Sequence, residues 1–209
     1  MMSTRRAFAE LLEPLSFHAH GSRFVRAVDG GLRQVIHLHG RSNPRERLYT
    51  VNLGVWSPEL ADFFARIDTR ANFAFPSRDP RAPDEVDCHW RQRLGFLIED
   101  PADLWWSIDD ARSPIELLVE YGLPALHRVS TREGMERSFL VGESERVRTA
   151  KELAFASVLM ATRGWSAQLE QIVGDIRRRV RPTPVWKEFV DAYEQALRRW
   201  AAEHGTQSD

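Results

Sequence analysis

The chain has 209 residues, of which 43% are hydrophobic and 28% charged, a balance that is typical of folded globular proteins and argues against disorder over most of its length. Its 29 basic and 30 acidic residues leave a formal net charge of -1, which provides no general field to attract nucleic acid or an anionic membrane. The single cysteine, Cys88, excludes an intramolecular disulfide and a multi-cysteine zinc site. No stretch approaches the roughly 18 to 20 apolar residues of a membrane span, and no apolar region follows the N-terminal arginines as in a signal peptide. We therefore expect a cytoplasmic protein.

The first third of the chain predicts an antiparallel meander. A short helix, capped by Ser3 or Thr4 and ended by Pro14, is expected to open the fold. Three strand-like runs follow, over residues 23–28, 32–40 and 48–56. An Asp-Gly-Gly turn separates the first two runs, and its glycines supply the positive φ angles that a tight hairpin needs. The third run alternates with a period of two, which indicates a sheet with one covered face.

The middle of the chain predicts two more strands between capped helices. Residues 57–59, Ser-Pro-Glu, start a helix, and residues 72–87 are rich in Pro, Asp and Arg without any period, which predicts a long loop. Residues 88–98 and 103–108 are predicted to be strands that pair with the first three. A capping box with proline at the first helical position, residues 113–116, predicts the next helix.

Beyond Gly142 the apolar spacing is helical throughout, and it predicts three helices, with prolines between the last two. The basic run Arg177-Arg178-Arg179 falls at a helix end, where positive charge complements the helix dipole, so we expect no nucleic-acid partner. The predicted fold class is α+β. An antiparallel sheet of about five strands, packed by helices on one face, forms a domain of residues 1–142, and an α-helical C-terminal extension of residues 143–209 packs on or next to it.

Several blocks of sequence, taken together, resemble a known family. They are Leu15-Ser16-Phe17 with Arg23-Phe24-Val25-Arg26, Val35-Ile36-His37-Leu38-His39, Thr50-Val51-Asn52-Leu53-Gly54-Val55, Arg91-Gln92-Arg93-Leu94-Gly95 with Asp103-Leu104-Trp105-Trp106, and Tyr121-Gly122-Leu123-Pro124-Ala125-Leu126. In this order they resemble a bacterial domain-of-unknown-function family, number 4304, over roughly residues 5–140. Members usually carry a glutamine where this chain has His39. The family has no assigned catalytic residues, so the resemblance bears on the fold and implies no activity.

Two His-x-His pairs are the pattern in the sequence that most strongly indicates a metal-binding or catalytic site. They are His18 with His20 and His37 with His39. Residues i and i+2 of a strand point to one face about 7 Å apart, so His37 and His39 could ligate one metal ion. If the segment around His18 lies beside that strand, four imidazoles converge, a set that suits zinc, copper, iron or nickel. No Asp or Glu stands beside the histidines in the sequence to complete the site, and the alternative is that they are half-exposed strand residues.

A second candidate binding face combines arginine with tryptophan. Arg91 and Arg93 share a strand face and could bind a carboxylate or phosphate, and Trp106 is the tryptophan we assign to that face. Only one of Trp105 and Trp106 can join the core, because neighbouring strand residues point to opposite sides. The alternative is that Trp106 caps the sheet and the arginines pair with nearby aspartates.

These patterns support two main hypotheses. The first is a non-catalytic protein-binding module, an accessory or immunity-like protein, that holds a protein partner with the open sheet face and the long loop and needs no cofactor. The second is an enzyme or sensor that holds a transition metal on the histidine-bearing strand. A small-ligand binder that uses Arg91, Arg93 and Trp106 is a third, weaker alternative.

Overall fold

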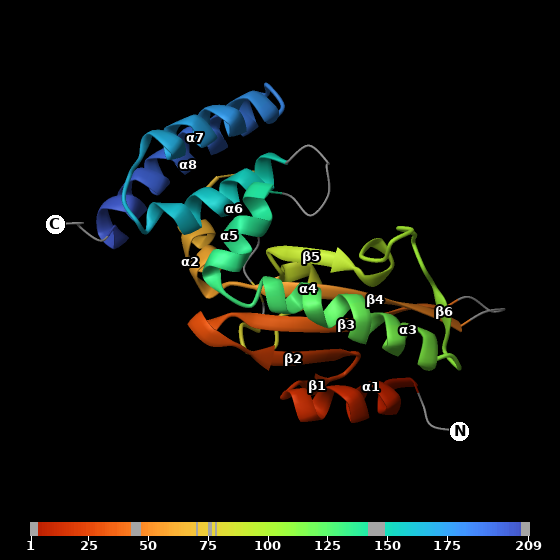
Figure 1. Cartoon of the computed structure of the whole chain (residues 1–209). Helices are drawn as coiled ribbons and strands as arrows, with labels where there is room; N and C mark the ends of the chain where they lie inside the picture. The colour runs from red at the N-terminus through yellow and green to blue at the C-terminus, as the bar shows by residue number, and fades with distance from the viewer. Residues whose placement is uncertain are drawn as a thin grey trace. The chain divides into compact units, whose positions relative to one another are not determined.

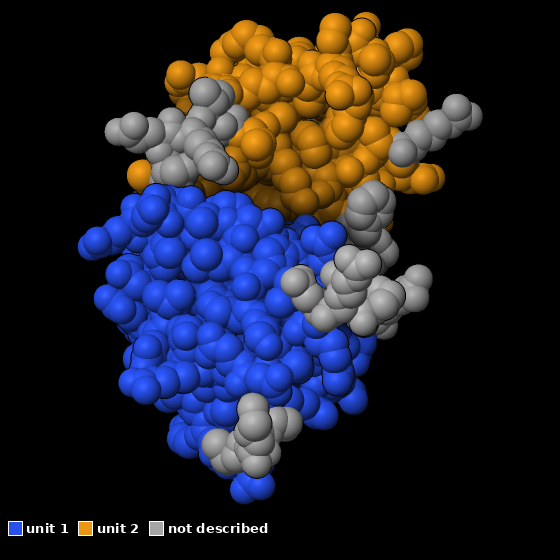
Figure 2. Space-filling view, turned by 90° about the vertical axis from the view of Figure 1, so that its right-hand side faces the viewer, with its two compact units in different colours: residues 1–57, 77–131 blue, residues 58–76, 132–209 orange. Residues whose placement is uncertain are grey.

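The structure, a computed structural model, describes residues 4–42, 47–69, 71–74, 77, 79–141 and 149–205. The chain divides into two compact units, one of residues 1–57 and 77–131 and one of residues 58–76 and 132–209 (Figure 2). The sequence predicted a division at residue 142, which lies outside the described residues. Residues 58–76 and 132–141 group with the C-terminal helices.

The first unit contains an antiparallel sheet with the order β1-β2-β3-β4-β5, and β6 also pairs with β4. The strands are β1 (His18–His20), β2 (Arg23–Ala27), β3 (Arg33–Ser42), β4 (Arg47–Trp56), β5 (Trp90–Arg93) and β6 (Trp106–Ser107). The predicted meander is β2, β3 and β4. The last two strands are shorter than the predicted runs, because the chain turns after Arg93 into a short 3-10 helix (Leu94–Phe96) and Ala102 N donates to Gly95 O (2.8 Å).

Helices cover one face of this sheet (Figure 1), as predicted. They are α1 (Thr4–Leu12), α3 (Arg112–Leu117) and α4 (Leu123–Arg128), the last two joined by a π-helical turn (Leu118–Gly122). The fully buried Gln34 of β3 donates to Leu126 O (2.7 Å), and Tyr49 of β4 donates to Asp110 O (2.6 Å). Of the two proposed cap residues of α1, Ser3 lies outside the described residues.

The second unit consists of helices around an aromatic core. They are α2 (Pro58–Ala65), α5 (Arg132–Val141), α6 (Ala150–Ala161), α7 (Ala167–Arg179) and α8 (Pro184–His204), and the last three are the predicted C-terminal helices. Phe63 and Phe64 of α2 contact the buried Tyr193 of α8, with ring centroids 5.7 and 6.1 Å apart. This packing, with the ion pair from Arg132 to Glu59 (2.9 Å), explains why α2 and α5 belong to this unit. Among the described helices, none combines the length and the apolar composition needed to cross a bilayer.

Candidate functional site

A row of polar side chains crosses the other face of the sheet, on five successive strands. The Cα partners in this row are His20, Arg23, His37, Asn52 and Arg93. Partners on adjacent strands project to the same side, so these five residues share a face. We call this side of the sheet the polar face. Its opposite side carries Phe24, Ile36 and Leu53, which are fully buried.

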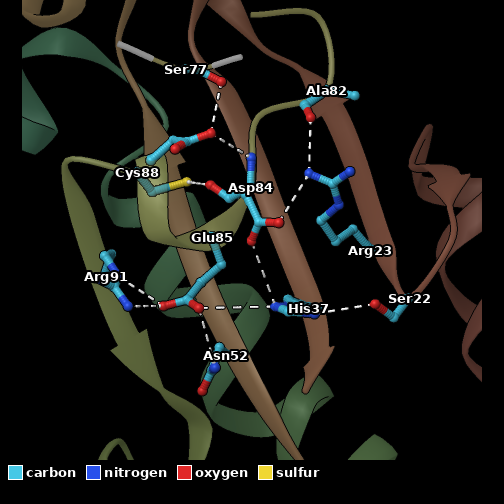
Figure 3. A network of polar contacts seen from close by, with 11 residues as sticks. Ser22, Arg23, His37, Asn52, Ser77, Ala82, Asp84, Glu85, Cys88 and Arg91 are labelled. Carbon is cyan, nitrogen blue, oxygen red and sulfur yellow. Dashed lines mark hydrogen bonds and ion pairs between the residues drawn. The ribbon is translucent and has the colours of Figure 1, made fainter. Parts of the chain in front are cut away.

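The end of the predicted loop lies along the polar face (Figure 3). Arg23 donates to Ala82 O (3.0 Å), and His89 N donates to Val55 O (3.0 Å). These two hydrogen bonds hold both ends of the segment of residues 82–89 against the sheet. Gly54 of β4 has no Cβ, and the buried Cys88 occupies the space where one would stand. The loop segment therefore lies close to β4, and it carries Asp84 and Glu85 to the side chains of β3.

His37, Asp84 and Glu85 form a cluster on the polar face. The Nδ1 of His37 lies 4.0 Å from Oδ1 of Asp84 and 3.9 Å from Oε2 of Glu85. One ligating atom from each of the three residues lies within 4.8 Å of the others. His37 Nδ1 is buried and has no hydrogen-bond partner among the described residues, whereas Nε2 lies 3.1 Å from Ser22 Oγ. The cluster thus brings together three atoms that could ligate one metal ion.

Glu85 is the most buried member, with a side chain that is 7% exposed. Arg91 Nε donates to its Oε1 (2.7 Å), and Asn52 Nδ2 donates to its Oε2 (3.3 Å). Burial alone raises the pKa of Glu85, but the neighbouring His37 and the charge and hydrogen bond of Arg91 outweigh burial and hold that pKa below its ordinary value. Glu85 is therefore a carboxylate at neutral pH.

The structure separates the two predicted histidine pairs. The rings of His37 and His39 lie on one face with centroids 5.5 Å apart, the arrangement expected from their spacing. His18 and His20, both exposed, lie on β1, which pairs with β2 and not with β3. Arg23 stands between His20 and His37 in the row, so the segment around His18 does not lie beside β3 and the condition for four converging imidazoles is not met.

The arginines of the second candidate lie on the polar face, but Trp106 does not join them. Arg93 pairs with Asp103 and also donates to Asn52 Oδ1 (3.2 Å). Trp106 lies on the helix-covered side, buried against Tyr49 with ring centroids 6.2 Å apart. Trp105 is the tryptophan near Arg93, whose guanidinium carbon lies 5.5 Å from its ring centroid. The assignment of Trp106 to the polar face was wrong because strand alternation requires one of two neighbouring residues to enter the core but does not indicate which one.

Asp84 and Glu85 are the site residues that the sequence analysis missed. They lie far from His37 along the chain, at the end of a segment with no periodic pattern. The only signal was the length of the predicted loop, because structureless loops of that length are often functional.

The polar face, the meander and the helices that cover its other side make up an α+β domain. Residues 8–120 match the family described as Domain of unknown function (DUF4304), and the chain belongs to this family. The match confirms the resemblance noted from the sequence. No curated protein and no solved structure matches the chain.

Proposed function

We propose that this chain is a binding module, and that the open end of its polar face holds an acidic segment of a protein partner. The observation that carries this proposal is a corner formed by His39, Arg41, Arg93 and Trp105. The first two lie on β3 with exposed side chains. Trp105 stands two residues after Asp103 and contacts both His39 (ring centroids 6.2 Å apart) and Arg93. We call these four residues the aromatic corner.

The charges of the polar face favour an acidic occupant. Arg23, Arg91 and Arg93 have carboxylate partners, namely Asp84, Glu85 and Asp103 in that order. Arg41 forms no ion pair with any described residue, so the corner carries positive charge in excess. Tryptophan and arginine are the residue types that contribute most to binding at protein interfaces, and a positive patch favours a negative one.

The function expected from this geometry is that of an accessory protein, of which immunity to a partner is one form. It predicts a stable heteromeric complex without turnover. A cytoplasmic location, predicted from the sequence, would suit such a role.

The proposal is tested by site-specific photo-cross-linking in cells of the native host. A photoreactive residue replaces His39, and the control replaces Arg112, whose side chain is 89% exposed on α3. We expect a discrete adduct from position 39 only, whose cross-linked peptide is rich in Asp and Glu. Arg41→Glu should abolish this adduct, whereas Arg5→Glu, a charge reversal on the exposed side of α1, should leave it unchanged.

Equal adducts from positions 39 and 112, or an adduct that survives Arg41→Glu, would rule out the aromatic corner as the binding surface. A cross-linked peptide without acidic residues would rule out the proposed chemistry of the partner.

A further inference from the structure

We propose that His37, Asp84 and Glu85 bind a divalent first-row transition ion, with Zn²⁺ as the preferred member of that class. This site differs from the four-histidine set predicted from the sequence, and it does not depend on the proposed partner. One imidazole nitrogen and two carboxylate oxygens are all accepted zinc ligands, and three protein ligands leave a coordination position for water or a substrate.

The distances suit a shared ion better than a direct contact. Two atoms bonded to one zinc ion at about 2.1 Å lie about 3.4 Å apart in a tetrahedral arrangement and farther apart at wider angles. The separations of 3.9 and 4.0 Å from His37 Nδ1 exceed the tetrahedral value by about half an ångström. Asp84 has a side chain that is 43% exposed and can supply that adjustment by rotation.

Each proposed ligand uses its other polar atom for a contact that holds the side chain in place. His37 Nε2 lies 3.1 Å from Ser22 Oγ, and a proton on Nε2 leaves the lone pair on Nδ1. Asp84 Oδ2 lies 3.5 Å from Arg23, and Glu85 Oε1 accepts from Arg91. Such outer contacts are the usual support of metal ligands, because they orient the rings and carboxylates.

The competing arrangement is an ion pair between protonated His37 and the two carboxylates. A charge-assisted hydrogen bond from His37 Nδ1 would be about 2.7 to 2.9 Å long. Neither carboxylate approaches that closely, and the buried Nδ1 has no hydrogen-bond partner among the described residues. Buried polar atoms without a partner are rare, and a bound ion satisfies this one.

Arg23 forms an ion pair with Asp84, and Arg91 forms one with Glu85, so the two arginines offset the negative charge of the carboxylates. They reduce the attraction for a cation, so we expect an affinity that depends on all three ligands rather than on two. Loss of one ligand should weaken binding at least tenfold, the range that perturbing the surroundings of a metal site typically produces.

The test uses the full chain, purified without a histidine tag and stripped with a chelator. Isothermal titration calorimetry should show that one equivalent of Zn²⁺ binds. Bound Co²⁺ should show the visible absorption bands of a site with a low coordination number. Asp84→Asn changes a half-exposed side chain by one atom and should weaken Zn²⁺ binding at least tenfold without altering the circular dichroism. His37→Gln should do the same.

Matched controls lie on the same face. Asp103→Asn alters a carboxylate outside the cluster, and the double variant His18→Gln, His20→Gln removes the other predicted histidines, so both should bind Zn²⁺ as the unaltered chain does. The proposal is overturned if the folded chain binds no stoichiometric Zn²⁺ or Co²⁺, if Asp84→Asn binds normally, or if the His18 and His20 variant loses the ion.

Discussion

Gly54 lies in the middle of β4, where it faces the segment that carries Asp84 and Glu85. A Cβ at this position would stand 2.6 Å from Cys88 Sγ and 2.8 Å from Cys88 Cβ, closer than non-bonded atoms approach. Cys88 is 2% exposed, so its side chain is packed among neighbouring atoms. Gly54→Ala should therefore push the loop segment off the sheet, although the backbone there tolerates alanine.

The expected cost follows from two opposing effects. Overpacking of a well-packed site costs about 1 to 3 kcal/mol. Alanine has less freedom than glycine in the unfolded chain, which returns about 0.5 to 1 kcal/mol. Gly54→Ala should then lower the free energy of unfolding by about 1 to 2 kcal/mol. Cys88→Gly removes both clashing atoms, so the two changes together should cost less than their sum, by about 1 to 2 kcal/mol.

Urea unfolding of the two single variants and the double variant, followed by circular dichroism and tryptophan fluorescence, measures this coupling. Cys88→Ala keeps the Cβ that lies 2.8 Å away and should relieve Gly54→Ala only in part. Strict additivity of the free energies, within about 0.5 kcal/mol, would refute the idea that the missing Cβ of Gly54 positions the loop.

Three further predictions concern buried polar groups. Burial raises the pKa of the Cys88 thiol, so we expect an aromatic disulfide reagent to modify Cys88 only after unfolding, and fast reaction of the native chain would contradict this. Tyr193→Phe removes hydroxyl contacts with Ser157 and with a backbone carbonyl of α6, and it should lower the free energy of unfolding by about 1 to 2 kcal/mol in urea titrations. The pKa of Glu85 is lower in the folded chain than its ordinary value of 4.5, so its stabilisation is complete above that value and is lost as the pH falls through the folded pKa. With chelator present, Glu85→Gln should cost about 1 to 3 kcal/mol at pH 7 and flatten the acid side of the stability curve, and unchanged slopes below pH 4.5 would count against this account.

Part of the candidate site was accessible from the sequence. The two-residue period of a strand placed His37 beside His39 and Arg91 beside Arg93, because alternation is a local property of extended backbone. The same rule could not choose between Trp105 and Trp106, since the parity of a strand relative to the core depends on its register with β4. The sequence could not predict the place of Asp84 and Glu85, because the sequence of a loop without a periodic pattern does not indicate which strand the loop packs against.

Local physical chemistry was enough to predict most elements. Alternating side chains and a glycine turn predicted β2 to β4, and apolar residues at spacings of three and four predicted the C-terminal helices. Contacts between distant segments settled the remainder. An apolar helix face such as Phe63 and Phe64 requires burial, but any apolar surface satisfies that requirement, so its place against α8 depends on long-range packing. The grouping of His37 with two carboxylates depends likewise on the close approach of Cys88 to a glycine, a contact that exists only once the chain has folded.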